Sequence, residues 1–374
     1  MAVYKLYPYK DSTIYSFYPN ANMGLDSILE VGNPLTSDGS SGVFRFLLAF
    51  DQSQIEDIID TKISNSLWQA NLKSYIANAE GISFNSTVYV YPVSGTWDNG
   101  TGHFGDNPIT TDGVSWTWRN YESGSIWEQS SYPVYVTASF PNNIKGGGVW
   151  YTGSSNPTLN VVSSQSFDIR SSKDFNVVVT DIVKGWYSSS FDNNGFIVKW
   201  SDEIEFSNSS SIQPDLKFFS VDTHTIYPPE LELRWRDYNF NTGSSTQTIL
   251  NTSLIYASVT ENPGFFYPES INRFRIECRP KYPTRVYQTS SIYTTNYYLP
   301  TASYYAIKDL DTNEYVVDFD EQYTQISADS NSSYFDLYMN GLQPERYYKI
   351  LIKTTINGST IILDDNYYFK IING

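Results

Sequence analysis

Short segments of β-branched and aromatic residues, separated by turn-forming clusters, constrain the fold more than any other feature of the chain. The clearest expected strands are 87–91, 134–137, 176–180, 196–200 and 347–353. Most of them alternate apolar with polar residues, as half-buried strands do. Clusters of glycine, proline and asparagine follow them at spacings typical of sandwich loops. The pattern predicts an all-β protein.

Helix is expected to be scarce, near a tenth of the chain. Two short connectors have helical periodicity, at 51–59 and 180–187. In the second, Thr180 or Asp181 is the expected N-cap. Its apolar face is expected to contain Ile182, Val183 and Trp186.

Charge and aromatic content narrow the classes of partner. Among 374 residues, 24 are Lys or Arg and 40 are Asp or Glu, for a net charge of −16, and 17% are aromatic. An acidic chain without a basic run repels phosphate backbones and anionic lipid, so we expect neither nucleic acid nor membrane as a partner. Cys278 has no second thiol, so we expect no disulfide and no zinc site.

The first residues lack the basic segment and apolar stretch of a secretory signal. We therefore expect the protein to be made in a cytosol and to act outside the cell only after lysis or assembly.

Turn-rich polar sequence after Trp235 marks the best domain boundary. We predict a first β-sandwich at 1–236, a connector at 237–258 and a second sandwich at 259–374. The first domain has a long insert loop, about 98–165, in which tryptophans lie among glycines rather than on alternating strands. Loops of this length in compact domains are usually functional or disordered, and the tryptophans argue for structure.

Landmarks in the first 236 residues resemble, in order, those of the DNRLRE domain, a β-sandwich also described as a carbohydrate-binding module. The resemblance depends on an opening aspartate, an asparagine–glycine turn, an arginine before an apolar run, a tryptophan before a variable loop, and a closing helical turn and strand. These landmarks are Asp11, Asn22–Gly24, Arg45–Asp51, Trp97, 179–186 and 193–196. The resemblance implies a jelly-roll sandwich.

A local motif in the second half resembles the tyrosine corner of immunoglobulin-like and fibronectin-like sandwiches. Leu342 is followed by Pro344 two residues later and by Tyr348 six residues later. In those families the phenol reaches back to the backbone of the preceding loop. The resemblance implies an Ig-like β-sandwich with Tyr348 in this structural role.

Together the halves resemble virion structural proteins of tailed bacteriophages. This resemblance implies a non-enzymatic particle component, located in a tail, baseplate, neck, fibre or capsid decoration, with other virion proteins as partners. A carbohydrate-binding adhesin that recognises host surface glycans is the alternative.

The insert tryptophans Trp97, Trp116, Trp118 and Trp127 are the candidate carbohydrate-binding residues, because aromatic faces stack on sugar rings. Packing within the loop or against another subunit is the other reading, and the one we favour.

We assign no catalytic residue, no cofactor and no metal ligand. His103 and His224 are far apart in sequence, and carboxylate pairs are expected by chance in an acidic chain. Oxygen-bearing residues at 98–112 could supply calcium ligands, but the pattern of a helix-loop-helix calcium loop is absent, and this question stays open.

Tyrosine pairs in the second half favour an oligomer or several copies in a symmetric assembly. Neighbouring residues in a strand point to opposite faces, so one ring of each pair needs a second layer or a partner. The pairs lie at 297–298, 304–305 and 367–368, and Tyr293 precedes them.

Overall fold

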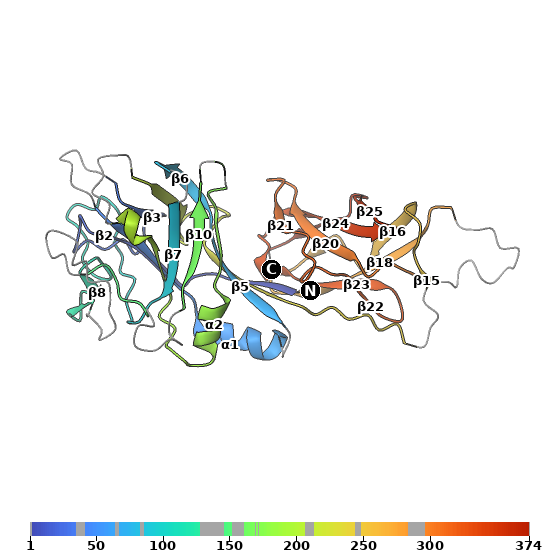
Figure 1. The fold of residues 1–374 in the computed structure, drawn as a ribbon, viewed down its shortest axis with the longest axis horizontal. Helices are drawn as coiled ribbons and strands as arrows, with labels where there is room; N and C mark the ends of the chain where they lie inside the picture. The colour runs from blue at the N-terminus through green and yellow to red at the C-terminus, as the bar shows by residue number, and fades with distance from the viewer. Residues whose placement is uncertain are drawn as a thin grey trace, which may run out of the picture. The chain divides into compact units, whose positions relative to one another are not determined.

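The computed structural model describes residues 2–34, 42–63, 67–82, 86–127, 146–151, 161–168, 170, 172–205, 213–243, 248–282 and 296–373 (Figure 1). Strands account for 44% of the chain and helix for 9%, so the predicted all-β class and low helix content are confirmed. In the described ranges, no helix is both long and apolar enough to cross a membrane. The expected strand 134–137 and Tyr293 lie outside the described residues.

The chain divides into two compact units. The N-terminal unit contains 6–64 and 69–232, and the C-terminal unit contains 1–5, 65–68 and 233–374. The main division follows Glu232, close to the predicted boundary at 236. We predicted residues 1–5 and 65–68 in the first domain, but they belong to the C-terminal unit. A compact unit is defined by contacts in space and not by order in the sequence.

The N-terminal unit is built around an eight-stranded antiparallel sheet. Its order is β10 (Ser163–Phe167), β7 (Ser86–Pro92), β12 (Phe196–Trp200), β4 (Phe44–Ala49), β3 (Ile28–Gly32), β13 (Asp215–Phe219) and β6 (Ile76–Glu80), with β2 (Lys10–Tyr15) paired to β4. A four-stranded sheet has the order β1 (Ala2–Leu6), β14 (Glu230–Trp235), β5 (Trp68–Ser74) and β11 (Phe175–Val178). A short hairpin pairs β8 (Trp118–Asn120) with β9 (Ser125–Ile126).

The C-terminal unit is a sandwich of two six-stranded sheets. One has the order β15 (Thr248–Ile249), β19 (Tyr297–Tyr298), β18 (Ile271–Pro280), β23 (Ser333–Tyr338) and β22 (Ser327–Ala328), with β16 (Ile255–Thr260) paired to β18. The other has the order β17 (Phe265–Phe266), β26 (Tyr368–Ile371), β24 (Tyr347–Ile356), β20 (Ser303–Asp309) and β21 (Tyr315–Val317), with β25 (Ser359–Leu363) paired to β24. A 3-10 turn, η3 (Met339–Gly341), follows β23.

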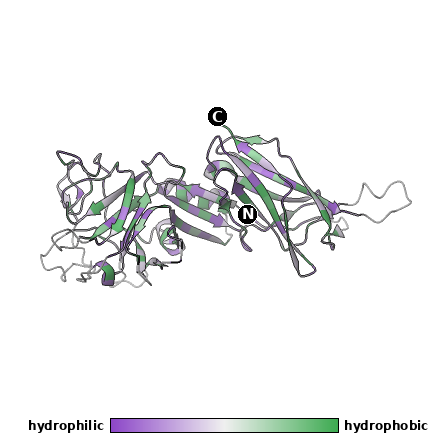
Figure 2. Cartoon of the chain, turned by 90° about the horizontal axis from the view of Figure 1, so that it is seen from above, coloured by the Kyte–Doolittle hydropathy of each residue, from purple (hydrophilic) through white to green (hydrophobic). Residues whose placement is uncertain are grey.

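Alternation of side chains explains how these strands form a core. In Figure 2, hydrophilic and hydrophobic residues alternate along strands of both units. Strand β24 buries Tyr348, Ile350 and Ile352, and the residues between them are less uniformly buried. Two of the described tyrosine pairs likewise bury one ring, Tyr298 and Tyr305, whereas in the third pair Tyr367 is half-buried and Tyr368 is exposed.

The helices occur where they were expected. In α1 (Gln52–Ile58), the Asp51 carboxylate accepts hydrogen bonds from the N–H groups of Ser53 and Gln54 and so caps the helix. A π-turn, η1 (Ile59–Ile63), extends α1, and α3 (Asp202–Glu205) is a single additional turn.

Helix α2 (Thr180–Tyr187) buries the predicted face, but its predicted cap is wrong. Val179 occupies the N-cap position, and no side chain caps the helix. The Thr180 hydroxyl instead accepts a hydrogen bond from the Ala70 N–H at 3.0 Å, because β5 lies next to it.

The predicted connector 237–258 is also corrected by the structure. It contains β15 and the first residues of β16, and Leu250 is buried in the core of the C-terminal sandwich. Its polar, turn-rich composition concealed these short edge strands, which are held by pairing rather than by a hydrophobic pattern of their own.

Candidate functional site

Asn22 holds the insert against the first turns of the N-terminal unit. Its Nδ2 donates to the carbonyls of Asn99 at 2.6 Å and Val114 at 2.8 Å. Its Oδ1 accepts from the N–H groups of Gly24 at 3.1 Å and Gly102 at 2.8 Å. The side chain is 1% exposed. An amide is suited to this position because it has two donors and an acceptor oxygen on one planar group.

Close backbone approach around Asn22 requires glycine. A Cβ on Gly24 would lie 2.1 Å from the carbonyl oxygen of Asn99, and one on Gly100 would lie 2.4 Å from Asn22 Oδ1. Gly100 also has a φ of +79°. Glycine is therefore needed in this segment because a side chain would collide with the neighbouring backbone or with Asn22.

Two insert carboxylates bind donors of the loop itself. Asp106 accepts from the His103 N–H at 2.9 Å and from the Thr110 hydroxyl at 2.7 Å, and the His103 N–H lowers the pKa of its carboxyl. Asp112 accepts from the N–H and hydroxyl of Thr101. Among the described residues, no group of three or more His, Cys, Asp or Glu could hold a metal ion.

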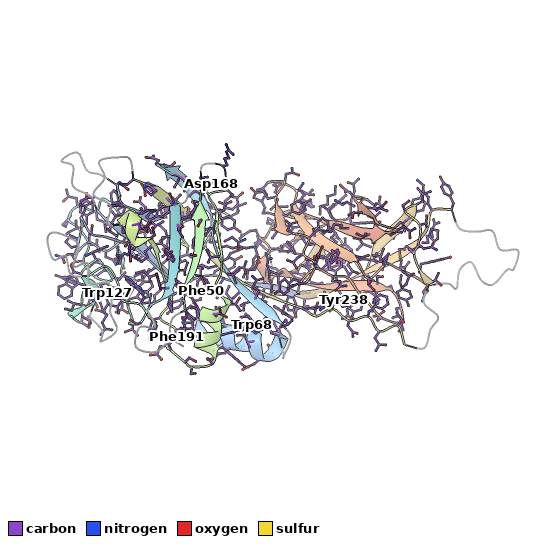
Figure 3. All side chains as sticks on the ribbon, in the orientation of Figure 1. Phe50, Trp68, Trp127, Asp168, Phe191 and Tyr238 are labelled. Carbon is purple, nitrogen blue, oxygen red and sulfur yellow. The ribbon has the colours of Figure 1, made fainter. Side chains whose placement is uncertain are left out.

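Three of the four candidate tryptophans are buried. Trp97 and Trp116 are 1% exposed and Trp127 is 5% exposed; Figure 3 labels Trp127 on the ribbon of the N-terminal unit. The indole N–H of Trp97 donates to the Asn194 carbonyl, and that of Trp127 donates to the Ser115 carbonyl. Packing is thus the role of these three rings, and a sugar cannot stack on them in this conformation.

A buried ion cluster lies beneath the insert. The Arg45 guanidinium donates to Glu205 Oε1 at 3.0 Å and Oε2 at 2.8 Å, and Lys199 Nζ lies 3.0 Å from Glu205 Oε2. Arg45 is 1% exposed, Lys199 2% and Glu205 0%. The guanidinium carbon lies 5.1 Å from the ring centroid of Trp116 and 5.2 Å from that of Trp150. Sequence reasoning missed this cluster because its members are up to 160 positions apart.

Trp118 differs from the buried insert tryptophans, because it is half-buried and contacts an exposed ring. Its centroid lies 5.5 Å from that of Tyr121, and its indole N–H donates to Asn20 Oδ1 at 3.0 Å. Tyr18, in the same turn as Asn20, lies 6.1 Å from the ring of Phe104. Phe104 is 57% exposed, Tyr18 50% and Tyr121 42%. We name Phe104, Tyr18, Trp118 and Tyr121 the aromatic ledge.

Sequence analysis found only Trp118 of these four. The available signal was aromatic residues within turn clusters, where no alternating strand can bury them: Tyr18 precedes Pro19 and Asn20, and Phe104 lies between His103 and Gly105. Their grouping depends on segments about 80 to 100 positions apart.

In the C-terminal unit, the Tyr348 phenol lies against the loop that precedes its strand. Its oxygen accepts from the Gln343 N–H at 2.7 Å and donates to the Gln343 carbonyl at 3.2 Å. Leu342 is 5% exposed and packs in the sandwich core, whereas Pro344 is exposed. Burial raises the pKa of Tyr348 above its ordinary value.

Two histidines and one cysteine are the remaining groups that could act in chemistry. His103 and His224 are both exposed. Cys278 is 7% exposed, and burial raises the pKa of its thiol to about 12, which removes its nucleophilic form at neutral pH.

Comparison with known proteins does not assign the chain to a family. No family model and no curated protein matches the chain. A β-glucuronidase from Parabacteroides merdae gives a TM-score of 0.16 at 11% identity, covering 84% of this chain and 30% of its own. A DUF4785 family protein from Legionella pneumophila gives a TM-score of 0.17 at 9% identity, and the match covers 85% of this chain and 66% of that protein. The chain thus spans about a third of the β-glucuronidase. These scores are too low to carry an argument.

Proposed function

We propose that this protein is a non-enzymatic structural component of a tailed-phage particle that contacts other virion proteins in several copies. In this proposal the N-terminal unit is a DNRLRE-like jelly roll and the C-terminal unit an Ig-like sandwich. The Tyr348 contact with Gln343 supports the second assignment, and the acidic, aromatic-rich all-β composition fits the proposal as a whole.

The observation that carries the proposal is an exposed aromatic patch on three adjacent strands of the C-terminal sandwich. Phe265 of β17 is 50% exposed, Tyr347 of β24 is 46% exposed and Tyr368 of β26 is 54% exposed. Phe265 and Tyr347 both pair in register with Lys370, and the rings of Tyr347 and Tyr368 lie 6.5 Å apart. We name these three residues the outer patch. Contiguous exposed aromatics of this kind mark protein contact surfaces.

The non-enzymatic part of the proposal is supported by the position of the most perturbed carboxyl in the N-terminal unit. Burial raises the pKa of Asp11 to about 8. The side chain is 1% exposed and accepts from the Val221 N–H at 2.7 Å. A substrate cannot reach it without unfolding the strand, so its perturbation follows from packing.

Particle assembly tests the proposal. The protein should copurify with phage particles, and an antibody should label one substructure on intact particles. Serine at all three outer-patch positions should reduce incorporation strongly. Tyr315→Ser is the matched control, because Tyr315 is also 45% exposed but lies on β21, at the other edge of the same sheet. Absence from purified particles would reject the proposal.

The second candidate function is a carbohydrate-binding adhesin for host surface glycans. The specific observation in its favour is the aromatic ledge, in which Trp118 keeps an accessible ring while the other insert tryptophans are buried. A glycan array distinguishes it from a purely structural role.

A further inference from the structure

We propose that the aromatic ledge is a binding site for a neutral oligosaccharide, an inference that rests on the second candidate function. Its four rings come from the turn at 15–21, the insert segment at 103–106 and the β8–β9 hairpin. The rings form two edge-to-face pairs, Phe104 with Tyr18 and Trp118 with Tyr121, at interplanar angles of 81° and 84°. Asn20, two residues after Tyr18, accepts the indole N–H of Trp118.

One short turn connects the two ring pairs of the ledge. The Tyr18 N–H donates to the Tyr15 carbonyl, and the Ala21 N–H donates to the Tyr18 carbonyl. Tyr18 and Asn20 are two residues apart in this turn, so their Cα atoms lie within about 7 Å. Tyr18 contacts Phe104, and the Asn20 side chain accepts the indole N–H of Trp118. The turn therefore holds one ring of each pair, and we infer that one oligosaccharide contacts both pairs.

The ledge is held in place before any ligand binds. The Phe104 N–H donates to Asp26 Oδ2 at 3.0 Å, and the Thr117 N–H donates to the Pro19 carbonyl at 2.9 Å. Asn22 fixes the backbone of the insert at Gly102, before these two contacts, and at Val114, between them. A site that is already ordered loses little conformational freedom on binding, which favours weak, polar ligands such as sugars.

The chemistry beside the rings suits hydroxyl groups. Sugars have C–H faces that pack on aromatic rings and hydroxyl edges that exchange hydrogen bonds. Exposed polar side chains adjoin both ends of the ledge: His103 next to Phe104, and Glu122 next to Tyr121. Alternation of ring faces with donors and acceptors is what a sugar chain requires.

Charge selects the class of sugar. The chain carries −16, and Asp26 and Asp106 hold the backbone at the Phe104 end through their carboxylates. Anionic glycans and nucleic acids would be repelled at short range. The ligand we infer is therefore uncharged, such as a glucan or a mannan.

A titration series on the full chain tests this inference. The probes are neutral hexasaccharides (β-1,4-glucan, α-1,4-glucan and β-1,4-mannan) and, as the charged comparison, alginate and hyaluronate fragments. Wild type should bind at least one neutral probe, with a change in tryptophan emission. Trp118→Ala and Tyr121→Ala should each weaken binding about tenfold or more, whereas Trp118→Phe should retain part of it.

The matched control is Tyr9→Ala, because Tyr9 is an exposed ring of the same unit, 61% accessible, that lies outside the ledge. It should bind like wild type, and circular dichroism should show that every variant is folded. Neutral-glycan binding that survives both ledge variants would overturn the ledge as the site while leaving the adhesin function standing. No glycan binding by wild type would overturn both. A preference for alginate, or ledge variants that lose particle incorporation without losing sugar binding, would also overturn the inference.

Discussion

The centre of the C-terminal sandwich is made of rings and aliphatic side chains, whereas the N-terminal unit encloses a full ion cluster. In the first, Phe335 stacks on Phe274 with centroids 5.2 Å apart and on Tyr305 with centroids 4.0 Å apart. In the second, Arg45 and Glu205 are 1% and 0% exposed and bind each other. The ion pairs described in the C-terminal unit are less completely buried: Arg346 and Asp309 are 17% and 6% exposed, and Arg273 and Asp336 are 42% and 26% exposed.

The difference follows from the insert. A backbone that is buried without strand partners still needs donors for its carbonyl groups. Arg45 Nη1 donates to the Gly147 carbonyl at 2.5 Å, and Asn22 donates to two carbonyls of the insert. Charged and amide side chains in the N-terminal unit thus replace the strand pairing that satisfies the backbone of the C-terminal sandwich.

The largest expected effect comes from removing the carboxylate of the ion cluster. Glu205→Gln leaves Arg45 buried without its counter-charge and leaves Lys199 with only the half-exposed Asp202. The substitution should lower the free energy of unfolding of the N-terminal unit by about 3–5 kcal/mol. Urea unfolding followed by tryptophan emission measures this unit selectively, because seven of the nine tryptophans lie in it.

Asp336→Asn is the matched change in the C-terminal unit. It removes the carboxylate of an exposed ion pair with Arg273. The free energy of unfolding should fall by at most about 1 kcal/mol. Equal costs for the two substitutions would contradict the contrast between the units.

The second prediction concerns Asn22→Asp, which keeps the size of the side chain and removes its two donors. The carbonyls of Asn99 and Val114 then face a carboxylate instead of a donor. Each unsatisfied carbonyl should lower the free energy of unfolding by roughly 1–3 kcal/mol. The insert should open, with a red shift of tryptophan emission and faster proteolysis within 98–127. Asn20→Asp keeps the acceptor used by Trp118 and should leave both unchanged.

The third prediction is a pH dependence specific to the N-terminal unit. The pKa of Asp11 is raised to about 8, first by burial and further by the charges of Asp222 and Asp26. Because the folded state holds this proton more tightly than the unfolded state, stability is present at low pH and is lost as pH rises toward 8. Between pH 6 and 8, wild type should lose about 2 kcal/mol more than Asp11→Asn in urea unfolding. Parallel stability curves would show that Asp11 does not titrate in this range.

The smallest expected effect is that of Tyr348→Phe. It removes the hydrogen bonds to the Gln343 backbone without changing the packed ring, which should cost about 1 kcal/mol. Calorimetry should show a lower transition for the C-terminal unit and an unchanged one for the N-terminal unit. A shift of the N-terminal transition would show that the two units do not unfold independently.

Several features that depend on neighbouring residues were predictable. The short helix that follows Asp51, the buried face of α2 and the contact of Tyr348 with the preceding loop each join residues within one or two turns of chain. The N-cap of α2 was predicted wrongly, because the Thr180 hydroxyl bonds to Ala70 of the neighbouring strand. The glycine and tryptophan content of 97–127 likewise indicated a structured loop, and Asn22 binds its backbone at three positions. In contrast, the sequence did not indicate which of its tryptophans are buried. Trp116, for example, packs against Arg45 of β4, which lies 71 positions earlier in the chain.

Local sequence thus determines the class of this protein, since alternation and turn chemistry act over a few residues and specify strands wherever they occur. Tertiary structure decides which polar groups are buried and which rings remain accessible. Asn22 and Glu205 look like ordinary surface residues of an acidic chain, and only contacts with residues 77 to 160 positions away place them in the interior. The physical reason is that a buried polar group requires partners, and in irregular loops the fold brings those partners from distant segments.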